Sequence, residues 1–137
     1  MVDEGPTYHR QWRDYRSARG ARPIRDFLVA LPDEDRATIF EEMEHVRKEG
    51  TRVARHLRGD IYEMRVTHDN KAYRLLFASV GRFDHILLSL EGFQKKTQRT
   101  PLAKMELAER RLADWQRRGE AKKRTATTTR AETKGDK

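Results

Sequence analysis

Apolar and polar residues alternate through the middle of the chain, over residues 61–77, with the two-residue period of β-strands. Asp69-Asn70 offers a two-residue turn in this segment, because both residue types tolerate a positive φ. Folding the chain at this turn places six apolar residues on one face, in the pairs Tyr62–Phe77, Met64–Leu75 and Val66–Tyr73. The opposite face carries Arg65 directly across from Arg74. The pattern therefore predicts a hairpin with one core face and one face that bears two opposed arginines.

A second hairpin is predicted to turn near Gly81-Arg82 and to return through a strand that ends at Gly92-Phe93. With a loop of two or three residues, the core face gains Ile86, Leu88 and Leu90. The arginine face gains His85, Leu87, Ser89 and Glu91. The returning strand runs directly into a basic segment at residues 94–101 (QKKTQRTP), so cations are expected beside the two arginines.

Helical periodicity and helix-start signals place the remaining elements. Pro23 suits the first position of a short helix, Asp33 suits the start of a second, and Thr100-Pro101 suits the start of a third. The predicted elements are an edge strand over residues 7–15, helices over 23–31, 33–50 and from 101 to about 118, and a basic connection over 53–59.

The predicted order is β-α-α-β-β-β-α, which indicates an α+β fold with a small antiparallel sheet, two N-terminal helices and a C-terminal helix. Residues 1–118 are expected to form one domain. Residues 119–137 are basic and rich in threonine and lack apolar periodicity, so a disordered tail is predicted there.

Composition narrows the function. The net charge is +8, which favours a polyanionic partner such as nucleic acid. The charge is uneven, since residues 33–50 hold seven acids and three bases while residues 51–100 hold five acids and ten bases. The chain has no cysteine, which fits a reducing cytosol. No apolar run approaches the ~20 residues of a membrane span, and the N-terminus lacks the pattern of a signal peptide.

Several enzyme classes are disfavoured by missing motifs. The five histidines have no HxxH or HExxH spacing, so no metal site is predicted. The sequence also has no glycine-rich phosphate loop and no GxSxG motif. No cofactor is expected on these grounds.

The opposed arginines allow two interpretations. Like charges directly opposite on a sheet lower its stability by up to roughly 1 kcal/mol. An anion held between Arg65 and Arg74 would offset this loss. Alternatively, each arginine pairs with a carboxylate of its own, Glu63 or Glu91, or extends into water.

The succession IYEMRV, AYRLLFA and ILLSLEGFQKKTQRTP, followed by a helix, resembles the RelE/ParE toxin superfamily. Within it, the sequence is most similar to the phage-derived HigB-like branch of type II toxin–antitoxin systems, over roughly residues 23–115. The resemblance implies the compact RelE-like fold, which is similar to that of microbial ribonucleases.

The same resemblance implies a cytoplasmic toxin that inhibits translation and arrests growth as a ribosome-dependent mRNA endonuclease, without a metal. Its implied partners are the ribosome, messenger RNA and a helix-turn-helix antitoxin with which it forms a hetero-oligomer, and no membrane is involved. Two alternatives stay open: a ParE-like inhibitor of DNA gyrase and a catalytically inactive RNA-binding module.

The resemblance also suggests roles for single residues. Arg65 and Arg74 would hold the scissile phosphate, and Lys95 and Lys96 would bind the backbone or transfer protons. His85 is the candidate acid or base on the open face of the sheet. The candidate RNA-binding residues are Arg55, Arg58, Lys71, Phe93, Gln98 and Arg99. The sequence lacks the acidic, aromatic and histidine cluster that better-studied HigB-type toxins carry near the C-terminus, so the resemblance provides no general base.

Overall fold

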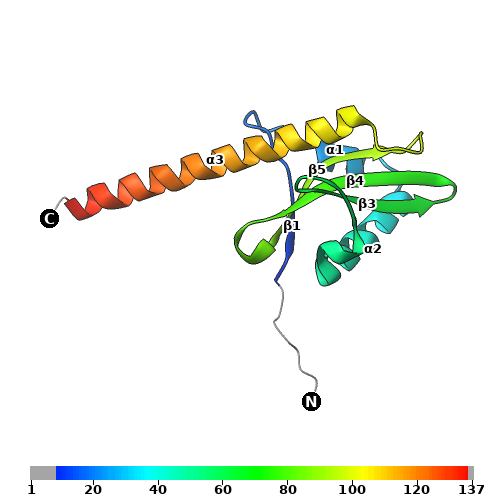
Figure 1. Ribbon diagram of the computed structural model, residues 1–137, viewed down its shortest axis with the longest axis horizontal. Helices are drawn as coiled ribbons and strands as arrows, with labels where there is room; N and C mark the ends of the chain where they lie inside the picture. The colour runs from blue at the N-terminus through cyan, green and yellow to red at the C-terminus, as the bar shows by residue number, and fades with distance from the viewer. Residues whose placement is uncertain (1–8, 136–137) are drawn as a thin grey trace, which may run out of the picture.

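The structure is a computed structural model that describes the backbone of residues 9–135 and the side chains of residues 9–119 (Figure 1). It confirms an α+β fold. The elements are β1 (Gln11–Asp14), α1 (Pro23–Val29), α2 (Asp33–Glu49), β2 (Arg55–Arg58), β3 (Ile61–His68), β4 (Lys71–Val80), β5 (Ile86–Gln94) and α3 (Leu102–Gly135), with 3-10 turns η1 (Gly50–Val53) and η2 (Arg82–Asp84).

The strands form one five-stranded sheet in the order β1-β5-β4-β3-β2. β1 pairs with β5 in parallel, and the other neighbours are antiparallel, so the sheet is mixed. β1 is an edge strand, as predicted, but it is shorter than the predicted segment, of which Thr7 and Tyr8 lie outside the described residues.

The first hairpin has the predicted register. Tyr62 pairs with Phe77, Met64 with Leu75, Val66 with Tyr73, and Arg65 with Arg74. Asp69 and Asn70 form the turn, with φ values of 48° and 66°. These are left-handed conformations, which Asp and Asn adopt more readily than other side-chain-bearing residues.

The second hairpin differs from the prediction in its loop and in one strand. Val80 pairs with Ile86, so the loop takes five residues and contains η2. The register shifts between Leu76 and Phe77, which pair with Glu91 and Ser89, so Leu90 is a bulge residue. The longer loop reverses the predicted faces of the first half of β5. Leu87 and Ser89 lie on the core face, and Ile86 and Leu88 lie on the arginine face. The bulge then returns Glu91 to the arginine face, as predicted.

Helices cover both faces of the sheet. α1 packs on β5 and α2 packs on β3, against the core face. Gly92 permits this contact, because a Cβ there would lie 2.5 Å from the Phe27 ring of α1. α3 crosses the arginine face, where the buried residues Ala108 and Leu112 pack near the sheet (Figure 1). The arginine face is therefore not open along its whole length, but Arg55 of β2 and Arg65 of β3 keep exposed side chains on it.

Two predicted boundaries are wrong. Residues 55–58, predicted as a connection, form β2, which pairs with β3 through Arg55–Glu63 and His56–Tyr62. This segment carries too few apolar residues to reveal a strand from its pattern, because it lies at the sheet edge.

α3 continues past Gly119, where the sequence predicts its end and the start of a disordered tail, to Gly135. The Ala, Lys, Arg and Glu residues beyond Gly119 are good helix formers, and one internal glycine costs only about 1 kcal/mol. The division of the chain into a domain and a tail stays a prediction. Among the described residues, no helix combines the length and apolar character needed to cross a membrane.

Candidate functional site

Four basic side chains gather on the arginine face near β2, around one acidic residue. β3 and β4 present their residues of this face by strict alternation, and β2 adds one residue opposite β3. The fourth residue follows β5, where its backbone N–H donates to the Ala72 carbonyl at 2.7 Å and so extends the ladder. This basic cluster consists of Arg55, Arg65, Arg74 and Lys95, and the acid is Glu63.

Glu63 lies at the centre of the basic cluster, with a fully buried side chain. Arg65 Nε donates to Glu63 Oε1 at 2.9 Å, and Arg74 Nε lies 3.7 Å from the same oxygen. Thr100 Oγ1 donates to the other oxygen. The two arginines therefore face each other across a shared carboxylate. Among the described residues they do not have a carboxylate each, as the second interpretation expected, and Glu63 alone lies between them.

Glu91, the other acid considered for the arginines, has different partners. Lys104 Nζ of α3 lies 2.8 Å from Glu91 Oε2, and Arg111 Nη1 lies 3.2 Å from Oε1. These contacts anchor α3 to β5, and among the described residues Glu63 is the one acid paired with Arg65 and Arg74.

Burial is graded across the basic cluster. The Arg74 side chain is 8% exposed and that of Arg65 is 44% exposed. Arg74 Nη1 also donates to the Tyr73 carbonyl at 3.0 Å. Burial lowers the pKa of Arg74, but a guanidinium stays charged in proteins. Arg74 thus supplies a fixed positive charge at the bottom of the site, and the more exposed cations lie around it.

Lys95 is the member of the basic cluster best suited to move a proton. Desolvation, and then the charges of Arg74 and Arg65, lower the pKa of its ammonium group. A lysine in a cationic setting releases its proton more readily than a solvated lysine. The geometry therefore combines fixed positive charge with one ammonium group whose pKa is lowered.

Three of the predicted RNA-binding residues are engaged elsewhere. Arg58 forms a bidentate ion pair with Glu109 of α3, in which Nε donates to Oε2 at 3.1 Å and Nη2 donates to Oε1 at 2.6 Å. Lys71 lies on the core face, 2.8 Å from the buried carboxylate of Asp35. Phe93 is on the arginine face, but its ring is buried, and Lys104 Nζ lies 5.4 Å from the ring centre. Phe93 therefore presents no exposed ring on which a base could stack.

The other predicted site residues fall into two groups. Lys96, Gln98 and Arg99 are exposed in the segment between β5 and α3, next to Lys95. His85 directly follows the η2 turn and precedes Ile86, which pairs with Val80. Val80 lies six residues along β4 from Arg74. At about 3.4 Å per residue this separation is roughly 20 Å. The structure therefore does not bring His85 to the basic cluster. Tyr73, which the predicted register places on the core side, is indeed buried there.

Sequence reasoning missed Glu63 as the centre of the site, although a signal existed. Glu63 precedes Arg65 by two residues, which puts both on one face of a strand. Thr100 was expected to cap α3, but its hydroxyl donates to Glu63, and the Pro101 carbonyl accepts the first helical N–H groups instead. The sequence offers no sign of this long-range contact.

Comparison with known proteins identifies the family of this chain. Residues 26–113 match the family described as phage-derived protein Gp49-like (DUF891). The chain is 31% identical over 120 residues to the "Probable endoribonuclease HigB1" of Mycobacterium tuberculosis strain CDC 1551/Oshkosh, covering 85% of this chain and 94% of that protein. The protein of the same name from strain ATCC 25618/H37Rv matches with the same identity and coverage. The chain therefore belongs to the phage-derived Gp49-like family and is a HigB-like toxin.

Proposed function

We propose that this chain is the toxin of a type II toxin–antitoxin pair and an endoribonuclease that cleaves messenger RNA on the ribosome. The main support is the basic cluster: Arg55, Arg65 and Lys95 have exposed or half-buried side chains beside the buried Arg74, and Glu63 pairs with two of the four cations. Such a patch retains a net positive charge and suits the phosphate of a nucleic acid strand. The similarity to a probable endoribonuclease favours RNA as that strand.

RNA cleavage without a metal has three chemical needs: removal of the 2′-hydroxyl proton, stabilisation of the phosphorane charge, and protonation of the 5′-oxygen that leaves. Arg65 and Arg74 meet the second need, because Glu63 holds their guanidinium groups in place. The lowered pKa of Lys95 suits it to the third need, and solvent water would accept the proton that the first need removes. Arg55, exposed at the edge of the patch, would bind the adjoining backbone.

The substrate strand would enter beside β2 and continue along the exposed segment that carries Lys96, Gln98 and Arg99. These residues extend the positive surface away from the basic cluster. The ribosome would position messenger RNA there, and this compensates for the lack of an exposed aromatic ring at Phe93. A helix-turn-helix antitoxin is the proposed partner in a cytoplasmic hetero-oligomer.

Induced expression tests the proposal. The wild-type chain should arrest growth, and co-expression of a helix-turn-helix protein encoded beside it should relieve the arrest. Lys95→Ala should restore growth, because loss of one electrostatic donor lowers a reaction of this kind by ~10² or more. Lys48→Ala, an equal charge change on the exposed surface of α2, is the matched control and should stay toxic. Primer extension should show new 5′ ends within translated codons in the wild type and control alone.

Two results would count against the proposal. Normal growth at verified high levels of soluble wild-type protein would exclude a toxin. Full toxicity of Lys95→Ala, with no new RNA ends and a loss of DNA supercoiling, would favour the ParE-like inhibition of gyrase instead.

A further inference from the structure

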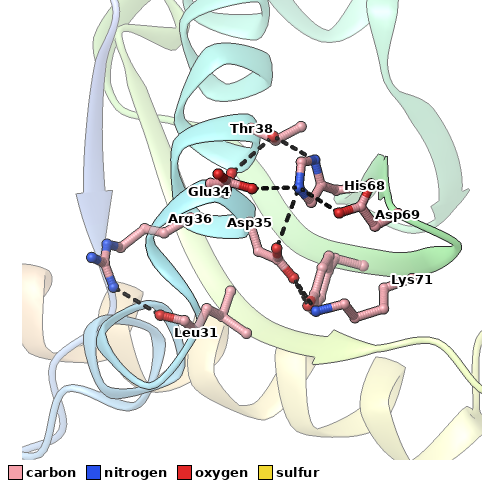
Figure 2. Close-up of polar contacts among 9 residues, drawn as sticks. Leu31, Glu34, Asp35, Arg36, Thr38, His68, Asp69 and Lys71 are labelled. Carbon is pink, nitrogen blue, oxygen red and sulfur yellow. Dashed lines mark hydrogen bonds and ion pairs between the residues drawn. The ribbon is translucent and has the colours of Figure 1, made fainter.

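A group of polar residues on the core side of the sheet, away from the basic cluster, surrounds one histidine nitrogen (Figure 2). His68, at the end of β3, directs Nε2 towards three carboxylates. The nearest oxygens are those of Asp69 at 3.4 Å, Asp35 at 3.6 Å and Glu34 at 3.7 Å. His68 Nε2 is inaccessible to solvent and has no hydrogen-bond partner among the described residues.

Hydrogen bonding on the other side of the ring assigns the tautomer of the neutral imidazole. The Thr38 hydroxyl has one proton, which it donates to the Glu34 carbonyl at 3.0 Å. Thr38 Oγ1 also lies 3.3 Å from His68 Nδ1, so it accepts from Nδ1–H. The neutral ring therefore presents the bare lone pair of Nε2 to three carboxylates. This arrangement is repulsive unless a cation lies between them.

The charges of the group match a divalent ion. Asp35 Oδ2 is occupied by Lys71 Nζ at 2.8 Å and by the Tyr73 hydroxyl, so the charge of Asp35 is already balanced and only Oδ1 faces His68. The carboxylates of Glu34 and Asp69 face His68 Nε2 with two negative charges that no lysine or arginine balances within ion-pair distance among the described residues.

The distances match shared coordination. Two ligand atoms that each lie about 2.0–2.2 Å from a tetrahedral zinc ion are about 3.3–3.6 Å apart. The three contacts of His68 Nε2 lie at or just beyond this range. Glu34, His68 and Asp69 each offer one ligand atom within 4.8 Å of the others. A histidine that binds a metal through one ring nitrogen usually donates a hydrogen bond from the other nitrogen. The contact of His68 Nδ1 with Thr38 Oγ1 has this arrangement.

We propose that Glu34, His68 and Asp69 bind a divalent transition-metal ion such as Zn²⁺, with Asp35 Oδ1 beside it. The imidazole favours zinc over magnesium, which prefers oxygen ligands alone. The site joins the first turn of α2 to the turn between β3 and β4 (Figure 2). His68 and the basic cluster lie on opposite faces of the sheet by strand alternation, so the ion clamps the fold and does not contact the RNA.

Calorimetric titration of the full-length, tag-free, EDTA-treated chain with ZnCl2 tests this site. The wild type should bind one equivalent of zinc, and MgCl2 should give no comparable binding. His68→Gln should abolish the binding, and Glu34→Gln and Asp69→Asn, which change exposed carboxylates, should each weaken it about ten-fold or more. His45→Gln is the matched control, because His45 Nδ1 faces a single carboxylate, Glu42, at 3.3 Å. It should bind zinc like the wild type.

Two further readouts separate a bound metal from a histidine that is merely protonated. Zinc in excess should raise the melting temperature of the wild type by about 5 °C or more, and that of His68→Gln by much less. Nitrogen-15 NMR should show that zinc shifts the His68 Nε2 resonance and that Nδ1 keeps its proton in the zinc-bound protein. Zinc binding equal in wild type and His68→Gln would overturn the proposal. So would the absence of zinc binding by the wild type, and protons on both ring nitrogens would then show that the carboxylates hold an imidazolium alone.

Discussion

Glu63 is the residue around which the basic cluster forms. A fully buried carboxylate is costly unless cations and hydrogen bonds compensate it, and Arg65, Arg74 and Thr100 do so here. The carboxylate in turn relieves the repulsion between the two arginines that pair across β3 and β4. The acid and the arginines are therefore mutually required, and removal of either should affect the fold as well as the site.

Because Glu63 and the arginines stabilise each other, Arg74→Ala should lower the stability of the fold. If the arginines were only a repulsive pair, the change would leave the fold intact or stabilise it slightly. Because Arg74 is buried beside Glu63 and satisfies the Tyr73 carbonyl, we expect a loss of about 2 kcal/mol in the free energy of unfolding. Arg65→Ala, at a more exposed position, should cost less than about 1 kcal/mol. Urea denaturation at neutral pH measures both.

A second substitution identifies the cause of the Arg74→Ala loss. Replacing Glu63 by Gln in the same chain removes the uncompensated charge and should recover part of the lost stability. Wild-type stability of Arg74→Ala alone would show that Glu63 does not depend on that arginine, contrary to the arrangement described.

Single residues were the hardest to place from sequence. Most acids of α2 are exposed or half-buried, yet Asp35 is 3% exposed and accepts from the Tyr73 hydroxyl. Its neighbours Asp33 and Glu34 have the same chemistry and are exposed, so composition gives no means of distinguishing them. Only the packing of α2 on β3 selects which acid is buried.

At the level of elements, the first hairpin was predictable because two independent signals agree. The Asp69-Asn70 turn and the alternation of apolar residues both require the same register. In β5 the signals fail, because residues 86–90 are almost all apolar and suit either face. A five-residue loop and a bulge at Leu90 then decide which side chain faces which helix. The residue types in this segment predict neither of them.

Asp114 holds α3 to the N-terminal end of the domain. The Tyr15 hydroxyl donates to Asp114 Oδ2 at 2.5 Å, and Arg118 Nη2 donates to the same oxygen at 2.7 Å. These bonds lower the pKa of Asp114 from 3.8 to about 2. A lowered pKa in the folded state stabilises the fold above the unfolded pKa, and that stability is lost as the pH falls from about 4 through about 2.

We therefore expect Asp114→Asn to cost about 1–2 kcal/mol at pH 7, after allowance for its partial exposure, and to flatten the loss of stability between about pH 4 and 2. Denaturant unfolding across this pH range is the measurement. Glu41→Gln, at an exposed position of α2, is the control and should follow the wild-type curve. A wild-type pH profile for Asp114→Asn would contradict the role given to this contact.

At the scale of the whole molecule, the sheet separates two kinds of chemistry. The core face carries α1, α2 and the carboxylates around His68, and the arginine face carries α3 and the basic cluster. The uneven charge along the sequence indicated this polarity, because the acid-rich segment is α2 and the base-rich segment includes β2 to β5. The extent to which α3 covers the arginine face could not be predicted, because an apolar stripe on a helix does not specify the surface on which it packs.

The chemistry of the cleaved RNA ends tests the central claim most directly. Attack by the 2′-hydroxyl, stabilised by cations alone, leaves a 2′,3′-cyclic phosphate on one fragment and a 5′-hydroxyl on the other. We expect these ends when the purified chain acts on messenger RNA in a translating ribosome, and a single 2′-deoxy substitution at the cut site should prevent the cut. A 5′-phosphate at the new end, or cleavage that persists at the 2′-deoxy position, would show that the basic cluster does not work in this way.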